Sequence, residues 1–256
     1  MKILCVGDLV GKGGLDKLKK ELSIIQEAER IDFTIVNGEN VASGMGMTQK
    51  DYNELCKLNI DVITMGNHTW GKMDIFNFIN NDNIVRLANY SKGVPGHGYT
   101  IIEKNNKKVA VINLIGRTAM SVLSENPFLC VDKILNKIQN DVDIIVVDFH
   151  AEATAEKIAM GYYLDGRVNA IFGTHTHVQT ADERILKNGT AYISDIGMTG
   201  PIDSVIGMDK DVSIKRFVTS LPERYKVATG ECMLNGIVIE IDDEKCRQKS
   251  IYRIKR

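Results

Sequence analysis

Val62-Ile63-Thr64-Met65 is a short apolar run, and Gly66-Asn67-His68 follows it directly. A run of this length that is rich in β-branched side chains and ends in polar residues is typical of a buried strand. The same transition occurs at four further places, and four of the five histidines lie in the resulting clusters. The five clusters are Gly7-Asp8, Asn37-Gly38-Glu39-Asn40, Gly66-Asn67-His68, His150 and Gly173-Thr174-His175-Thr176-His177.

Strand-like runs alternate with segments of helical period along the chain, which indicates an α/β architecture. Lys108–Ile112 and Leu234–Ile241 show clearer alternation, as in a sheet with one covered face or an antiparallel edge. Thr48 is a plausible helix N-cap. The predicted helices are Lys17–Arg30, Thr48–Leu58, Met73–Ile79 and Val131–Ile138.

The composition limits the number of domains, the classes of partner and the location that fit this chain. With 256 residues, 44% apolar and 25% charged, the chain can bury one large core, and we expect a single domain over residues 1–256. A net charge of −1 and a pI near 6.5 give no electrostatic reason for a nucleic-acid or anionic-membrane partner. No apolar stretch approaches the roughly 20 residues of a membrane helix, and the first apolar run is too short for a signal peptide. A cytoplasmic location is therefore expected.

The polar clusters offer imidazole, carboxylate and amide groups but no thiolate. The five cysteines are widely spaced and form no Cys-x-x-Cys motif, so neither a disulfide framework nor a structural cysteine site is indicated. A mixed nitrogen and oxygen set suits manganese, iron(II) or zinc. Since ligands bind at the carboxyl ends of parallel strands in α/β folds, we expect the clusters to meet at one edge of a parallel sheet.

Each candidate ligand also has a structural interpretation. A single histidine after a strand, such as His150, is more often a hydrogen-bonded structural residue than a metal ligand. Asp8 and Glu39 could be helix N-caps, since carboxylates are favoured there. Neither interpretation explains why an amide or imidazole recurs at the later strand ends. The five clusters together therefore favour a metal site.

In their order along the chain, these clusters resemble the motif blocks of the calcineurin-like metallophosphoesterase superfamily. Within it, four longer stretches are similar to the bacterial YmdB family of cyclic-nucleotide phosphodiesterases, and the resemblance covers nearly the whole chain. The stretches are Ile63–Trp70, Asp148–Thr154, Gly173–Asp182 and Asp195–Pro201. The resemblance implies an α/β sandwich with two mixed β-sheets flanked by helices.

The resemblance also implies roles for individual residues. Asp8 and His177 would hold a first metal, and Glu39 would bridge it to a second. His68 would act as general acid toward the leaving oxygen or stabilise its charge, a role typically worth about 10²–10⁴ in rate. The ligands of the second metal would be Asn67, His150 and His175.

The chain departs from the superfamily pattern at three positions. Many members have Asp-x-His in the first block, whereas Leu9 and Val10 follow Asp8 here, so Asn40 could supply an oxygen instead of the missing imidazole. The bridge is a glutamate where an aspartate is usual. Thr69 stands where many relatives have an acidic residue that would orient His68. The richer oxygen set weakens the argument for zinc relative to iron or manganese.

The activity implied is hydrolysis of cyclic nucleotides, most of all 2′,3′-cyclic nucleoside monophosphates, by attack of a hydroxide held by two divalent metals. Iron or manganese is favoured, and zinc is possible. The partner would be a small-molecule phosphodiester, and the resemblance implies a homo-oligomer. Two alternatives stay open: a phosphomonoesterase or nucleotidase with the same site, and a non-catalytic metal-binding regulatory protein.

Overall fold

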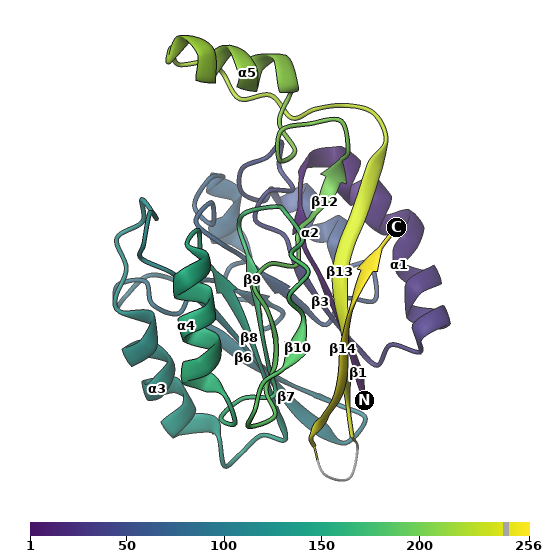
Figure 1. The fold of residues 1–256 in the computed structure, drawn as a ribbon, viewed down its shortest axis with the longest axis vertical. Coiled ribbons are helices and arrows are strands. Elements are labelled where there is room, and N and C mark those ends of the chain that lie inside the picture. Colours follow the sequence, from purple (N-terminus) through teal and green to yellow (C-terminus); the bar gives the residue numbers. More distant parts are fainter. Residues whose placement is uncertain (243–245) are drawn as a thin grey trace.

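The computed structural model describes residues 1–242 and 246–256. Within these residues, two mixed β-sheets lie face to face, and helices cover their outer faces (Figure 1). The predicted α/β sandwich is therefore confirmed.

The first sheet has the strand order β2-β12-β13-β1-β3-β4-β5, with β14 paired to the other part of β13. Its central strands β1, β3, β4 and β5 are parallel, whereas β13 runs antiparallel to β1. The strands are β1 (Lys2–Val6), β2 (Asp8–Leu9), β3 (Phe33–Asn37), β4 (Val62–Thr64), β5 (Ile84–Val85), β12 (Met198–Pro201), β13 (Cys232–Ile241) and β14 (Gln248–Lys255).

The second sheet has the order β10-β11-β9-β8-β7-β6. Strands β7, β8, β9 and β11 are parallel, and the two edge strands run antiparallel to their neighbours. The strands are β6 (Tyr99–Lys104), β7 (Lys107–Ile115), β8 (Ile144–His150), β9 (Ala170–Thr174), β10 (Arg184–Ile185) and β11 (Ala191–Ile193).

The four predicted helices are present but differ in type or extent, and two further helices, Thr154–Leu164 and Lys210–Thr219, were not predicted. Thr48 is an N-cap, as predicted, and forms a capping box with Asp51. The segment beginning at Met73 is a 3₁₀ helix, η1, and not an α-helix. The helices are α1 (Gly11–Glu29), α2 (Gln49–Leu55), η1 (Met73–Asn77), α3 (Pro127–Ile138), α4 (Thr154–Leu164) and α5 (Lys210–Thr219). None of the helices in the described ranges has both the length and the hydropathy that a bilayer crossing requires.

Three apolar layers hold the sheets and helices together. The middle layer lies between the sheets, the first outer layer packs the first sheet against α1 and α2, and the second packs the other sheet against α3 and α4. Alternation along β8 assigns its residues to these layers: Ile144 and Val146 point into the middle layer, and Ile145 and Val147 point out. Asp148 and His150 follow on the inward face, so the interior changes from apolar to polar toward the carboxyl ends of the strands.

The polar clusters meet at the ends of strands from both sheets. The first sheet contributes the ends of β1, β3 and β4, and the second contributes the ends of β8 and β9. The expectation that they share one edge of one parallel sheet is therefore wrong. Apolar periodicity identifies each strand but carries no information on which strands pair, and this chain divides its parallel strands between two sheets.

Leu18→Ala tests the first outer layer. Leu18 is fully buried in α1, so its truncation leaves a cavity and is expected to lower the free energy of unfolding by about 2–5 kcal/mol. Ile24 lies on the same helix but is 55% exposed, and Ile24→Ala should change it by less than about 0.5 kcal/mol. Urea denaturation of both variants measures the difference, and equal effects would contradict this packing.

Candidate metal centre

The structure joins all eight predicted site residues in one network of contacts at the carboxyl end of the sandwich. Glu39 lies near the centre: its carboxylate accepts from Asn40 Nδ2 at 3.1 Å and from the backbone N–H of His68 at 3.0 Å. His150 Nε2 lies 3.2 Å from Glu39 Oε1. Asn67 and His175 contact His150, His177 contacts Asn40, and Asp8 contacts the backbone of His175. Asp8 and His175, which are 167 positions apart in the sequence, are therefore in direct contact.

Asp8 and Glu39 are both fully buried carboxylates. Asp8 Oδ2 accepts from the backbone N–H of His175 at 3.2 Å, but its Oδ1 has no hydrogen-bond partner among the described residues. A buried carboxylate oxygen without a partner is costly unless a cation binds it. No Lys or Arg of the described chain forms an ion pair with either carboxylate, so a metal ion is the partner that this geometry fits.

His150 offers its Nε2 atom to the site, because a chain of hydrogen bonds occupies its other nitrogen. The Thr174 hydroxyl donates to Asp148 Oδ1 at 2.7 Å, which leaves its oxygen to accept from His150 Nδ1 at 2.9 Å. Asp148 is fully buried and also accepts from Thr64 of the first sheet at 2.6 Å. The ring of His150 is therefore oriented by both sheets. Such outer partners fix the tautomer of histidines that ligate metals.

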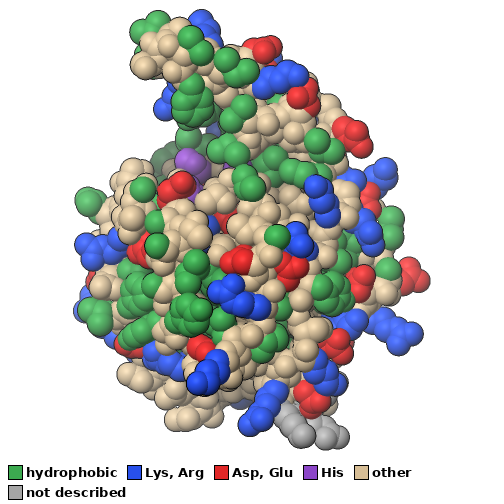
Figure 2. All heavy atoms as spheres, in the orientation of Figure 1, with side chains coloured by type: hydrophobic (Ala, Val, Ile, Leu, Met, Phe, Trp, Pro, Cys, Tyr) green, Lys and Arg blue, Asp and Glu red, His purple; other side chains and the backbone are tan. Residues whose placement is uncertain are grey.

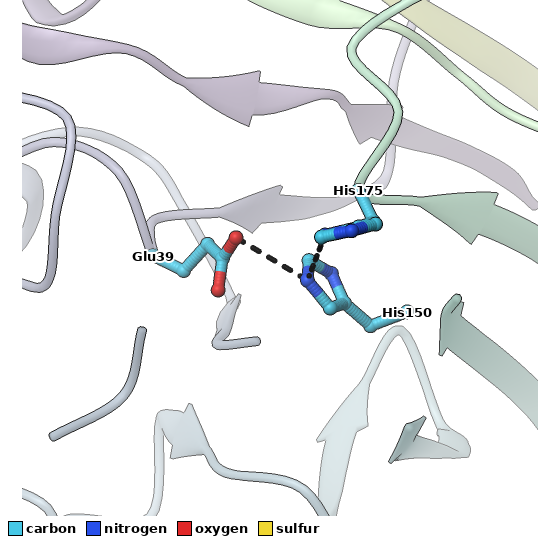
Figure 3. A group of neighbouring side chains, drawn as sticks. All are labelled: Glu39, His150 and His175. Atoms are coloured by element: carbon cyan, nitrogen blue, oxygen red, sulfur yellow. Dashed lines mark hydrogen bonds and ion pairs between the residues drawn. The ribbon is translucent and has the colours of Figure 1, made fainter. Parts of the chain in front are cut away.

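His175 offers its opposite nitrogen. Its Nε2 lies 3.2 Å from a carboxylate oxygen of Glu152, while its Nδ1 lies 3.1 Å from His150 Nε2. Asn67 Oδ1 also faces His150 Nε2, at 2.7 Å. Glu39, His150 and His175 provide ligand atoms that all lie within 4.8 Å of one another (Figure 3). This spacing and chemistry suit one divalent metal.

His177 and Asn40 form the other side of the network. His177 Nδ1 donates to the backbone carbonyl of Ile206 at 2.7 Å, so its Nε2 faces the site. That nitrogen lies 3.1 Å from Asn40 Nδ2, and the same amide nitrogen donates to Glu39. The Asn40 side chain thus directs its nitrogen, not its oxygen, toward Glu39 and His177. For its oxygen to bind a metal there, as the sequence suggested, the side-chain amide would have to turn by 180°.

The surroundings shift the pKa values of Asp8, Glu39, His150 and His175 strongly. Burial raises the pKa of Asp8 to about 7, although His177 and His150 act in the opposite direction. Burial acts against the charge of Glu39, but the charge of His150 and its hydrogen bond outweigh this and lower the pKa of Glu39 to about 2. For His150, burial is likewise outweighed by Glu39, and the pKa rises to about 9. Burial and the charge of His150 lower the pKa of His175 to about 3.

His68 differs from the other site residues because its imidazole forms no hydrogen bond with any described residue. Its backbone N–H is held by Glu39, and its side chain is partly exposed. Thr69 does not orient it: the Thr69 hydroxyl is buried and donates to the carbonyl of Gly66 at 2.6 Å. The threonine therefore closes the turn that carries Asn67 and His68.

Comparison with known proteins identifies the family of the chain. A sequence model described as YmdB-like protein matches residues 4–254. The chain belongs to the YmdB-like family. The resemblance that the motifs indicated is thus confirmed over nearly the full length.

Relatives of this family member include the 2′,3′-cyclic-nucleotide 2′-phosphodiesterase of Bacillus subtilis (strain 168). It is 51% identical over 255 residues, which cover 99% of this chain and 96% of that protein. A crystal structure of a novel phosphatase from Mycoplasma pneumoniae is 37% identical with a TM-score of 0.95, covering 100% of this chain and 93% of that one. A hypothetical protein from Thermus thermophilus is 34% identical, also with a TM-score of 0.95, covering 100% and 99%.

Several residues of this YmdB-like site were not assigned a role from the sequence. Asp148 and Thr174 orient His150, and Glu152 contacts His175. Asp148 carried a signal, since a carboxylate on the inward face of an otherwise apolar strand needs polar partners. Glu152 is 51% exposed and resembles any surface acid in the sequence.

Metal binding in this family member should depend on pH. A metal held by Asp8 and His150 would require Asp8 to be ionised and His150 to be neutral, and the pKa values of these groups are about 7 and about 9. We therefore expect affinity for Mn²⁺ to rise with pH through this window and binding to release protons. Calorimetric titrations in buffers of different ionisation enthalpy measure both quantities. Constant affinity across the window, without proton release, would contradict the description.

Proposed function

We propose that this chain is a phosphodiesterase that uses two divalent metal ions to hydrolyse 2′,3′-cyclic nucleoside monophosphates. The observation that carries the proposal is the buried set of converging oxygen and nitrogen ligands, in which Asp8 Oδ1 lacks a partner among the described residues. The substrate class is taken from the Bacillus subtilis relative, whose described activity is of this kind. The whole of residues 1–256 is proposed to act as one domain.

The contacts support a division of the ligands between two metals. Asp8 and His177, with Asn40 beside them, would hold the first, and Asn67, His150 and His175 would hold the second. Glu39 is proposed as the bridge because its carboxylate contacts both His150 and the Asn40 amide that faces His177. Three oxygen ligands from Asp8, Glu39 and Asn67 favour iron or manganese, and zinc is compatible.

When bound, two metals would hold the phosphate oxygens and supply a nucleophilic water at neutral pH. The residues of the chain contribute position and a proton. Asp148 holds Thr174, and Thr174 keeps His150 turned toward the site. Glu152 contacts His175 directly and keeps it turned the same way. His68 is proposed to protonate the leaving oxygen, which fits an imidazole free of other hydrogen bonds in the described structure and anchored by its backbone to Glu39.

His68→Ala and Glu39→Gln separate chemistry from metal binding. His68→Ala should keep two metals per chain and lower kcat for 2′,3′-cyclic AMP by about 10²–10⁴. Glu39→Gln should lose both metal and activity, because it weakens both metals at once. Metal analysis of anaerobically purified protein alongside turnover measures the two effects. Normal metal content and turnover in Glu39→Gln would exclude the bridging role.

A phosphomonoesterase is the second candidate, because the similar Mycoplasma pneumoniae structure is described as a phosphatase. Hydrolysis of bis-p-nitrophenyl phosphate compared with p-nitrophenyl phosphate separates the two activities. If the wild-type chain prefers the monoester and His68→Ala loses that activity, a monoesterase at the same site would replace the diesterase proposal.

A cytoplasmic location stays a prediction.

A homo-oligomer is also proposed. Helix α5 and the segments beside it extend away from the rest of the molecule, and Figure 2 shows hydrophobic side chains along this arm above a hollow that contains a histidine. On α5, Phe217 is 81% exposed and Val218 is 78% exposed, and only Ser213 is buried. Exposed apolar surface of this kind is typical of subunit contacts.

Sedimentation velocity tests this proposal. The wild-type chain should sediment as an oligomer, and Phe217→Glu should shift it toward the monomer because a charge cannot be buried cheaply in an apolar contact. Lys210→Glu on the same helix, where the side chain is exposed and paired with Asp203, is the control and should change little. A monomeric wild type would exclude the oligomer.

A further inference from the structure

The loop that carries His175 and His177 has an unusual backbone. Both histidines have positive φ values, 99° and 66°, in a region that residues with a side chain rarely adopt. Two residues apart on a regular strand, they would point the same way. Here His175 Nδ1 faces His150, whereas His177 Nε2 faces Asn40. The strained backbone thus directs the two side chains to opposite sides of the site, and other contacts must hold it.

Thr176, between the two histidines, is bound twice by one carboxylate. Asp195 Oδ2 accepts from the Thr176 hydroxyl at 2.8 Å and from its backbone N–H at 3.2 Å. Asp195 Oδ1 accepts from the backbone N–H of Gly197 at 2.8 Å. The backbone of Asp195 is in turn paired with Thr180 by two hydrogen bonds of 3.0 Å. Asp195, which follows β11, therefore holds the loop that carries the two histidines at Thr176 and again at Thr180.

Lys157 of α4 forms a buried ion pair with Asp195. Its Nζ lies 2.7 Å from Asp195 Oδ2, and the two side chains are 3% and 2% exposed. The amine reaches Asp195 past Gly173: a Cβ at that position would meet Lys157 Cδ at 2.9 Å and would also clash with the backbone oxygen of Ser194. A lysine buried on a helix, a glycine in the neighbouring strand and an aspartate beyond the next strand thus form one unit.

We propose that Asp195 and Lys157 are positioning residues that hold His175 and His177 at two different metals. Neither side chain forms a hydrogen bond or ion pair with a predicted ligand: Asp195 acts through Thr176, and Lys157 acts through Asp195. The inference rests on the proposed metal function. A positioning role can be distinguished from a purely stabilising role of the ion pair. Replacing a buried ion pair by apolar residues of similar size often leaves stability unchanged or raises it. Stability can then be restored without restoring the acceptor for Thr176.

The experiment compares stability with metal affinity in the full chain, stripped of metal and titrated with Mn²⁺ by calorimetry. The variants are Asp195→Asn, Thr176→Val, Lys157→Met and the double variant Lys157→Met/Asp195→Leu. Leu164→Ala, in the same helix as Lys157 and fully buried, is the control that destabilises without touching the loop. Thermal unfolding of each metal-free variant defines a temperature at which all of them are folded, and the titrations are made there. If Asp195→Asn does not fold, Thr176→Val still tests whether the contact between Thr176 and Asp195 affects Mn²⁺ affinity.

The wild type should bind two Mn²⁺ per chain. Asp195→Asn should weaken Mn²⁺ binding by about 10–100-fold, and Thr176→Val should weaken it less, because its backbone N–H still binds Asp195. The double variant should recover thermal stability but not affinity. Wild-type affinity in the stable double variant, or an equal loss in Leu164→Ala, would overturn the proposal. A wild type that binds no Mn²⁺ would instead contradict the proposed function.

Discussion

Two fully buried carboxylates without a Lys or Arg partner constrain the rest of the site. Charge is costly to remove from water, and each buried carboxylate of the described structure has a different set of stabilising partners. Asp195 has Lys157, and Asp148 has the hydroxyls of Thr64 and Thr174. Asp8 and Glu39 have only imidazole, amide and backbone N–H groups around them. A cation at the centre would satisfy both, and the fold supplies the surrounding histidines and amides from five strand ends.

The fold makes this burial possible by joining two sheets. Apolar residues fill the space between them for most of its depth, and polar ones replace them only near the carboxyl ends of the strands. Asp148 spans the boundary, since it accepts hydrogen bonds from both sheets. The geometry of the site therefore depends on the packing of the sandwich, because Asp8, Glu39 and Asn67 follow strands of one sheet, whereas His150 and His175 lie at the ends of the other.

The sequence identified a set of polar residues that the structure brings together, but not the sheets that position them. Asp8, Glu39, Asn67 and the histidines could be predicted because each follows a short apolar run. Which strands share a sheet could not, because strand pairing depends on contacts between distant segments. Lys157 illustrates the limit most clearly: a lysine on a helix is normally solvated, and its burial depends on the space left by Gly173 and on the ion pair with Asp195. The strained conformations of His175 and His177 likewise depend on Asp195, which lies 18 or more residues away.

Anomalous diffraction from crystals of the Mn²⁺-loaded chain tests the central claim most directly. Two peaks per chain are expected about 3.5–4 Å apart, the spacing of dinuclear hydrolase sites. One should be ligated by Asp8 and His177, the other by His150 and His175, with Glu39 between them. A single peak, or two peaks that do not share Glu39, would contradict it.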